Sequence, residues 1–106
     1  MKTGVGRVGL SIEEIERIRQ ILARYPSVEQ AILYGSRAKG TARLYSDIDI
    51  AVRGNVTHSD WAGILNDLDD LLLAYKIDLS LYKNIRSKEL REHIDRVGIV
   101  IFQRDR

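Results

Sequence analysis

Hydrophobic positions follow two different periods along this chain. Apolar side chains recur every three or four residues in three segments, which predicts amphipathic helices at residues 11–24, 57–75 and 87–95. Between them, shorter stretches are apolar throughout or alternate with polar residues, which predicts strands at residues 28–34, 46–52, 76–82 and 97–102. Strands that alternate with helices favour an α/β or α+β fold, but they leave the order of the strands open.

Capping and turn residues fit the same boundaries. Ser11 and Glu14 form a predicted capping box at the start of the first helix, and Pro26 ends it. Residues 35–40 interrupt the pattern and are expected to form a short helix, and Gly54 marks a turn.

The composition is that of one globular domain. With 106 residues, 44% of them apolar and 30% charged, we expect a flexible N-terminal arm at residues 1–10 and a single domain at residues 11–106. The absence of cysteine excludes disulfides, thiolate metal sites and a cysteine nucleophile. No apolar run approaches the roughly 18 residues of a spanning helix. We therefore expect a cytoplasmic protein that does not enter a membrane.

Two motifs are set aside. Residues 4–9 match G-x-G-x-x-G, but the dinucleotide fingerprint needs a strand before it and only three residues are available there. His93 follows Arg86 at a spacing similar to the R-x4–6-H motif of HEPN ribonucleases. We interpret that spacing as coincidence, because the HEPN fold is all helical and this chain is rich in strand patterns.

Charge is unevenly distributed around the predicted short helix. The net charge of +2 does not by itself indicate nucleic-acid binding, and no direct DNA binding is expected. However, residues 35–46 contain three basic residues and no acid, and acids follow at once. The basic residues are Arg37, Lys39 and Arg43. A basic loop beside carboxylates suits a metal-bound polyphosphate.

The acids that follow lie on one face of a predicted strand. Asp47 and Asp49 are two residues apart, so both carboxylates point to the same side, about 6–7 Å apart. Asp78 lies on the polar side of the next predicted strand. If the two strands are neighbours, the three carboxylates converge. Oxygen ligands of this kind select Mg²⁺ or Mn²⁺, and two such ions about 3.5–4 Å apart would stabilise an in-line displacement at phosphorus.

Gly35 and Ser36 supply the complementary half of this candidate site. A glycine after a strand permits close approach of the backbone, and Ser36 offers a hydroxyl and an N–H at a predicted helix start. That combination suits a terminal phosphate. Each piece alone has an ordinary structural explanation, but their joint occurrence in order favours a functional site.

These residues resemble a known signature. Gly35 and Ser36, ten further residues, and then Asp47 and Asp49 are similar to the G-S-x10-D-x-D pattern of the DNA-polymerase-β-like nucleotidyltransferase superfamily. The short chain and the later Asp78 resemble its minimal branch, which includes the MntA-type antitoxins paired with HEPN toxins. The similarity spans roughly residues 28–82.

The resemblance implies a fold, a site and a reaction. The fold would be a mixed β-sheet of about four strands flanked by helices. Asp47, Asp49 and Asp78 would hold Mg²⁺, and Asp78 would help to deprotonate the attacking hydroxyl. Gly35 and Ser36 would bind the triphosphate, assisted by Arg37, Lys39 or Arg43. Lys39 stands where the commonest family pattern has arginine, which keeps the charge but loses the planar fork.

The function implied is transfer of a nucleoside monophosphate, AMP from ATP, to a hydroxyl. In MntA-type members the acceptor is a tyrosine of the HEPN toxin, so the chain would act as an antitoxin by AMPylation. Because the chain has no added helical domain to hold an acceptor, a partner chain or a homo-oligomer would have to supply it. Two alternatives stay open: a non-catalytic binding module, and the catalytic subunit of a two-chain small-molecule transferase.

Overall fold

The computed structural model describes residues 10–39, 47–71 and 76–104. Residues 1–9 of the predicted N-terminal arm at 1–10, the G-x-G-x-x-G motif, Arg43 and residues 72–75 lie outside the described residues. The long helix predicted to run to residue 75 ends at Asp69. In chain order the elements are α1 (Ile12–Ala23), β1 (Gln30–Tyr34), α2 (Ser36–Lys39), β2 (Ile48–Arg53), α3 (His58–Asp69), β3 (Ile77–Leu81), the 3-10 turn η2 (Tyr82–Asn84), α4 (Lys88–Val97) and β4 (Ile99–Gln103). Every predicted helix and strand has a counterpart among them.

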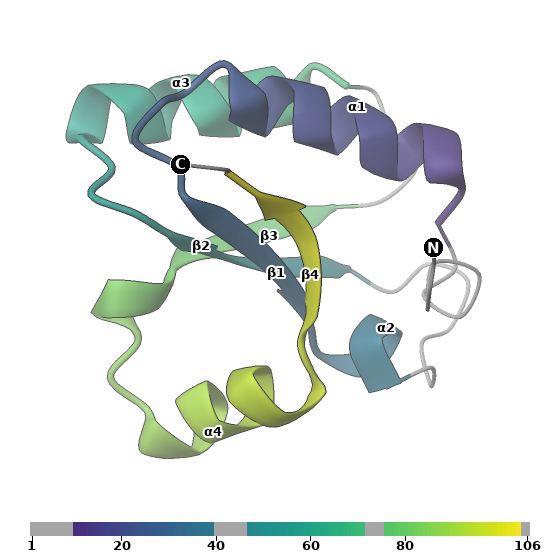
Figure 1. The fold of residues 1–106 in the computed structure, drawn as a ribbon, viewed down its shortest axis with the longest axis vertical. Coiled ribbons are helices and arrows are strands. Elements are labelled where there is room, and N and C mark those ends of the chain that lie inside the picture. The colour runs from purple at the N-terminus through teal and green to yellow at the C-terminus, as the bar shows by residue number, and fades with distance from the viewer. Residues whose placement is uncertain (1–9, 40–46, 72–75, 105–106) are drawn as a thin grey trace.

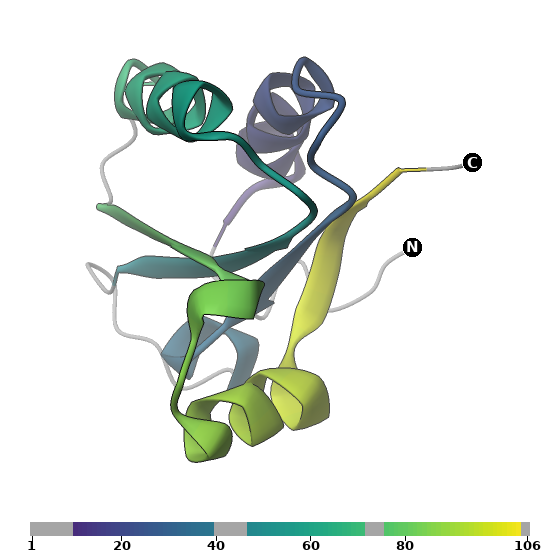
Figure 2. The ribbon, with the colours of Figure 1, turned by 90° about the vertical axis from the view of Figure 1, so that its left-hand side faces the viewer.

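The four strands form one mixed sheet in the order β3-β2-β1-β4. β1 pairs antiparallel with both β2 and β4, whereas β2 and β3 run parallel. The long helices α1 and α3 lie together on one face of this sheet, and α4 lies on the other face with α2 beside it (Figure 1). Figure 2 shows the same layers from the side. The expectation of a mixed four-stranded sheet flanked by helices is confirmed.

The main apolar core lies between the sheet and the pair α1 and α3. β2 contributes every second side chain, because successive residues of a strand point to opposite faces. From β2 these are Ile48, Ile50 and Val52, each completely buried. The helices add the apolar stripe predicted from their spacing, and its fully buried members are Ile18, Leu22 and Ile64.

A second, smaller core lies on the opposite face beneath α4. Its buried members are Ile32, Tyr34, Ala51 and Ile94, with η2 and the first turn of α4 packed against them. Ala51 sits in β2 between the polar positions of that strand and is completely buried. On the α4 face β2 thus places one buried apolar residue between Asp49 and Arg53.

Local signals place the ends of these elements. The hydroxyl of Ser11 accepts from the amide of Glu14 at 3.0 Å, and the Glu14 carboxylate accepts from the amide of Ser11 at 2.9 Å, so the predicted capping box is confirmed. Gly54 follows β2 with a φ of +143°, in the region that favours glycine. The other glycine with positive φ is Gly35, at the candidate site.

The carboxyl end of α1 is held by a residue from the far end of the chain. α1 has no basic residue in its own last turn. The guanidinium of Arg104 instead donates to the carbonyl oxygens of Ala23, Tyr25 and Val28, at 3.3, 3.0 and 2.8 Å. Ala23 is the last residue of α1, so the cationic guanidinium at its carbonyl complements the helix dipole, and the contacts to Tyr25 and Val28 tie down the segment that follows.

None of the helices within the described residues has the length and apolar character to cross a bilayer.

Candidate active site

The register of the sheet brings three polar side chains into one row on the α4 face. Asp49 of β2 lies opposite Tyr34 of the antiparallel neighbour β1. Asp49 also lies opposite Asp78 of the parallel neighbour β3. Residues that face each other across adjacent strands point to the same side of the sheet, so Tyr34, Asp49 and Asp78 share one face. The condition set by the sequence, that the two acidic strands be neighbours, is therefore met.

Gly35 is the point where the backbone comes closest to this row. It follows β1 with a φ of +77°, and a Cβ at this position would clash with Oδ2 of Asp49 and lie 3.3 Å from its Cγ. Only glycine combines that backbone conformation with that contact. The close backbone approach expected for a glycine after this strand is present. The space that a Cβ would need is occupied by the carboxylate of Asp49, an acid of the predicted site.

The surroundings of Asp49 raise the pKa of its carboxyl group. Burial raises its pKa above the ordinary value, and the neighbouring carboxylates of Asp78 and Asp47 raise it further. The guanidinium of Arg37 acts in the opposite direction. Because the net effect is a raised pKa, the ionised row of acids is destabilised until cations approach it.

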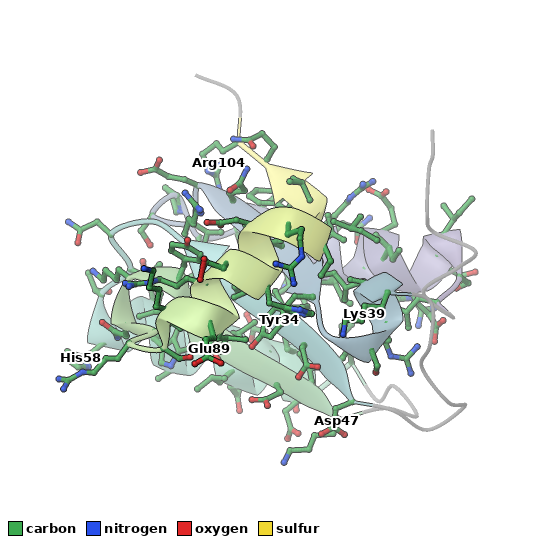
Figure 3. The ribbon with its side chains drawn as sticks, turned by 90° about the horizontal axis from the view of Figure 1, so that it is seen from below. Tyr34, Lys39, Asp47, His58, Glu89 and Arg104 are labelled. Carbon is green, nitrogen blue, oxygen red and sulfur yellow. The ribbon has the colours of Figure 1, made fainter. Side chains whose placement is uncertain are left out.

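The basic residues around the site differ in their exposure. Arg37 is only 2% exposed, and its Nε donates to the backbone oxygen of Asp47 at 3.3 Å. Lys39 is exposed at the end of α2 and Ser36 is half-buried at its start. Figure 3 shows Lys39, Tyr34 and Asp47 toward the same side of the molecule. Arg37 thus supports the acidic strand from within, whereas Lys39 is open to solvent.

Tyr34 is part of the second core and also borders the acids. It is 8% exposed. Burial raises the pKa of its phenol, a hydrogen bond with the side chain of Ser80 lowers it, and the carboxylates of Asp49 and Asp78 raise it again. Its hydroxyl is therefore neutral and tied into the polar end of the α4 face.

His93 is a site neighbour that the sequence analysis missed. It lies on α4, and its Nε2 accepts a hydrogen bond from the amide of Gly35 at 3.1 Å. Its ring also meets the ring of Tyr34 edge to face, with centroids 6.3 Å apart. One signal could have found it: His93 follows Leu90 by three residues and precedes Ile94, so it borders the apolar stripe of α4.

The acidic residues suit a hard divalent cation, because they offer carboxylate oxygens and because Asp49 and Asp78 face each other on adjacent strands. Three carboxylates supply only oxygen ligands, which is the set that Mg²⁺ prefers. Asp47 and Asp78 are exposed and Asp49 is half-buried. Within the part of the chain that the structure describes, however, no three acidic or histidine side chains already lie close enough together to hold a metal ion.

Comparison with solved structures gives relatives of the same fold. A toxin–antitoxin structure with AMP-PNP is 23% identical over 86% of this chain and 74% of that chain, with a TM-score of 0.69. A structure of the toxin–antitoxin MntA-HepT is 20% identical over 89% of this chain and 74% of that chain, with a TM-score of 0.64. At such identities the similarity concerns the fold. No curated protein gives a significant match to the sequence.

A family model matches most of the sequence directly. It is described as polymerase beta, nucleotidyltransferase, and it covers residues 16–106. That range contains the whole sheet, the row of acids and the Gly35 turn. The chain therefore belongs to the polymerase beta nucleotidyltransferase family.

Proposed function

We propose that this chain is a Mg²⁺-dependent nucleotidyltransferase that moves AMP from ATP to a hydroxyl of a partner protein. The acceptor we propose is a tyrosine of a HEPN toxin, which the transfer would inactivate, so the chain acts as an antitoxin. The observation that carries the proposal is the register that sets Asp49 opposite Asp78, beside the Gly35 turn. The fold relatives, one of them with AMP-PNP and one named MntA-HepT, support the nucleotide and the partner.

The reaction divides between the two halves of the site. Ser36 binds the triphosphate at the turn that Gly35 makes possible, and Lys39 neutralises it. The acceptor oxygen attacks the α-phosphorus while the bond from that phosphorus to the bridging oxygen of the β-phosphate breaks. Pyrophosphate leaves, and the proton of the acceptor passes to Asp78.

The acids would hold the cations. Asp47, Asp49 and Asp78 are the proposed ligands of two Mg²⁺ ions, whose charge stabilises the entering and leaving oxygens when they are bound. Arg37 is buried, so in this proposal it acts on the position of Asp47 and the charge of Asp49 and does not contact the phosphates.

The decisive experiment follows the label from ATP. The purified chain is incubated with Mg²⁺, a candidate HEPN protein, and ATP labelled at either the α- or the γ-phosphate. We expect label in the HEPN band from the α-position only. Asp47→Asn should reduce it by more than about a hundredfold, a loss typical of removing transition-state stabilisation.

A matched acid on the other side of the molecule controls for surface charge. Asp69 is exposed on α3, which covers the opposite face of the sheet, so Asp69→Asn should transfer like the wild type. Label that arrives from the γ-position would contradict nucleotidyl transfer. A tight complex without label would instead favour the binding module, and label on a small molecule would favour the two-chain transferase.

Thermal stability tests the bound state without any acceptor. A ligand that binds only the folded protein stabilises it by about 2.7 kcal/mol at a hundred times its Kd. We expect Mg²⁺ with ATP to raise the Tm more than either alone. Equal stabilisation by ATP in the presence of a chelator would contradict binding through the metal.

A further inference from the structure

α4 does more than cover the small core, because it contributes a hydrogen bond to the turn at the candidate site. The amide of Gly35 donates to Nε2 of His93 across 58 residues of sequence, at 3.1 Å. The imidazole is half-buried and packs edge to face on Tyr34, so its ring plane is held by a neighbour from β1. This is a side chain fixed by packing that points a nitrogen lone pair at one backbone amide.

The direction of that hydrogen bond defines the state of the ring. An amide can only donate, so Nε2 must be the unprotonated nitrogen and the proton of the neutral ring must sit on Nδ1. An imidazolium has no acceptor and cannot make this bond. The interaction therefore exists only with neutral His93.

The amide that donates to His93 belongs to Gly35, whose backbone lies against the acid Asp49. Gly35 has a φ of +77° and lies against the carboxylate of Asp49, so a small rotation of this peptide changes both the turn and the space left for the acid. Ser36 follows directly and starts α2. A fixed Gly35 amide therefore also fixes the start of α2 relative to Asp49 and Asp78.

We propose that His93 is a positioning residue that presets the Gly35 and Ser36 turn for the triphosphate of the nucleotide by accepting the Gly35 amide hydrogen bond. This inference rests on the proposed function, because it assigns that turn to the triphosphate. His93 does not contact the reacting atoms, and it acts only through Gly35.

Among the described residues, burial and two cations favour the neutral form of His93. Burial lowers its pKa, and the cations Lys39 of α2 and Arg96 of α4 lower it further. Tyr34 of β1 presents an uncharged ring. The acceptor is therefore available at neutral pH and is lost only in acid, below the ordinary histidine value of about 6.5.

The test uses two substitutions at His93 and a second histidine as control. In His93→Gln the carboxamide oxygen can accept the same hydrogen bond and does not titrate, whereas His93→Leu has no acceptor. His58 is exposed at the start of α3 and lies on the opposite side of Figure 3 from Lys39 and Asp47, so His58→Leu reports the loss of an imidazole away from the candidate site. The probe is AMP-PNP with Mg²⁺, measured by calorimetry, and a thermal melt checks that each variant is folded.

We expect His93→Leu to weaken AMP-PNP binding by about tenfold or more, a typical cost of leaving a donor unsatisfied. His93→Gln and His58→Leu should stay within about threefold of the wild type. The wild type should lose affinity in acid in a step that His93→Gln lacks. If His93 had only a structural role, both His93 variants would have a lower Tm. The loss of AMP-PNP affinity in acid would then be the same in His93→Gln as in the wild type.

The outcomes separate the two proposals. Folded His93→Leu that binds AMP-PNP like the wild type overturns the role of His93, as does an equal loss in the Gln and Leu variants. Wild-type protein that binds AMP-PNP but labels no acceptor overturns the proposed transfer and leaves the role of His93 standing. Wild-type protein that does not bind AMP-PNP overturns both.

Discussion

Among the described residues, the core between the sheet and the pair α1 and α3 has fifteen buried apolar residues, whereas the core beneath α4 has four. The same strands make both faces, because their side chains alternate. β2 illustrates this, since Ile50 is completely buried on one side while Asp49, the residue before it, is half-buried on the other.

The difference follows from what covers each face. Two twelve-residue helices lie over the first face. A ten-residue helix and the four-residue α2 lie over the second, where the acids line the end near the Gly35 turn. One face is therefore closed by apolar packing, and the other carries the acids of the candidate site. Changes on the two faces should separate into effects on folding and effects on chemistry.

The largest effect on stability is expected from Ile50→Ala on the closed face. Ile50 is completely buried, and truncating such a side chain typically costs about 2–5 kcal/mol. Urea denaturation measures the change in the free energy of unfolding. Asp47→Asn on the open face is the matched comparison, and because Asp47 is exposed it should change that free energy by no more than about 0.5 kcal/mol. Similar losses in the two variants would remove the distinction between the faces.

An intermediate effect is expected from Gly35→Ala, which joins both roles. An alanine at a φ of +77° costs about 1–3 kcal/mol in backbone strain, and its Cβ would displace Asp49. We expect a lower free energy of unfolding, measured by urea denaturation, together with loss of nucleotide binding, measured by calorimetry.

Gly54→Ala is the control for backbone strain. Gly54 also has a positive φ and a crowded Cβ position, but it lies at the other end of β2 from the acids. It should lose stability and keep the nucleotide affinity of its folded fraction. Loss of affinity in this variant would show that strain alone disturbs the site.

The smallest effect is a gain in stability from Asp49→Asn without metal. The raised pKa means that the folded state holds the Asp49 proton more tightly than the unfolded state, so stability falls as pH rises through the folded pKa. The neutral amide avoids that loss. In a chelator at neutral pH, the Tm should rise by less than the roughly 4–8 °C that 1 kcal/mol produces in a domain of this size, because Asp49 is partly solvated.

The pH series checks the sign of that effect. The difference in Tm between Asp49→Asn and the wild type should vanish in acid, where the carboxyl is protonated in both states. A variant that melts below the wild type at neutral pH would mean that the carboxylate stabilises the fold and that the repulsion among the acids is small.

Local features of the fold were predictable, and long-range ones were not. The Ser11 capping box and the Gly54 turn depend on residues close in sequence, so their patterns sufficed. The pairing of β2 with β3 is parallel, and β4 lies beside β1. Both pairings join residues far apart in the sequence, so the spacing of apolar residues does not predict them.

The candidate site divides in the same way. The alternation of residues 46–52 is enough to predict that Asp47 and Asp49 lie on the face opposite Ile48 and Ile50. The sequence analysis did not predict two features of the site. They are the hydrogen bond from the Gly35 amide to His93 and the burial of Arg37. Both depend on how separate elements pack, and a basic residue in a polar segment is ordinarily expected at the surface.

The place of β4 has a consequence for the order in which the protein is made. β1 needs β4 as its second neighbour, and the carbonyls after α1 need Arg104, yet both partners leave the ribosome last among the described residues. Until then, one edge of β1 presents unpaired N–H and C=O groups that another nascent chain could pair with. Pairing of β4 with β1 closes this edge and ends that exposure to aggregation.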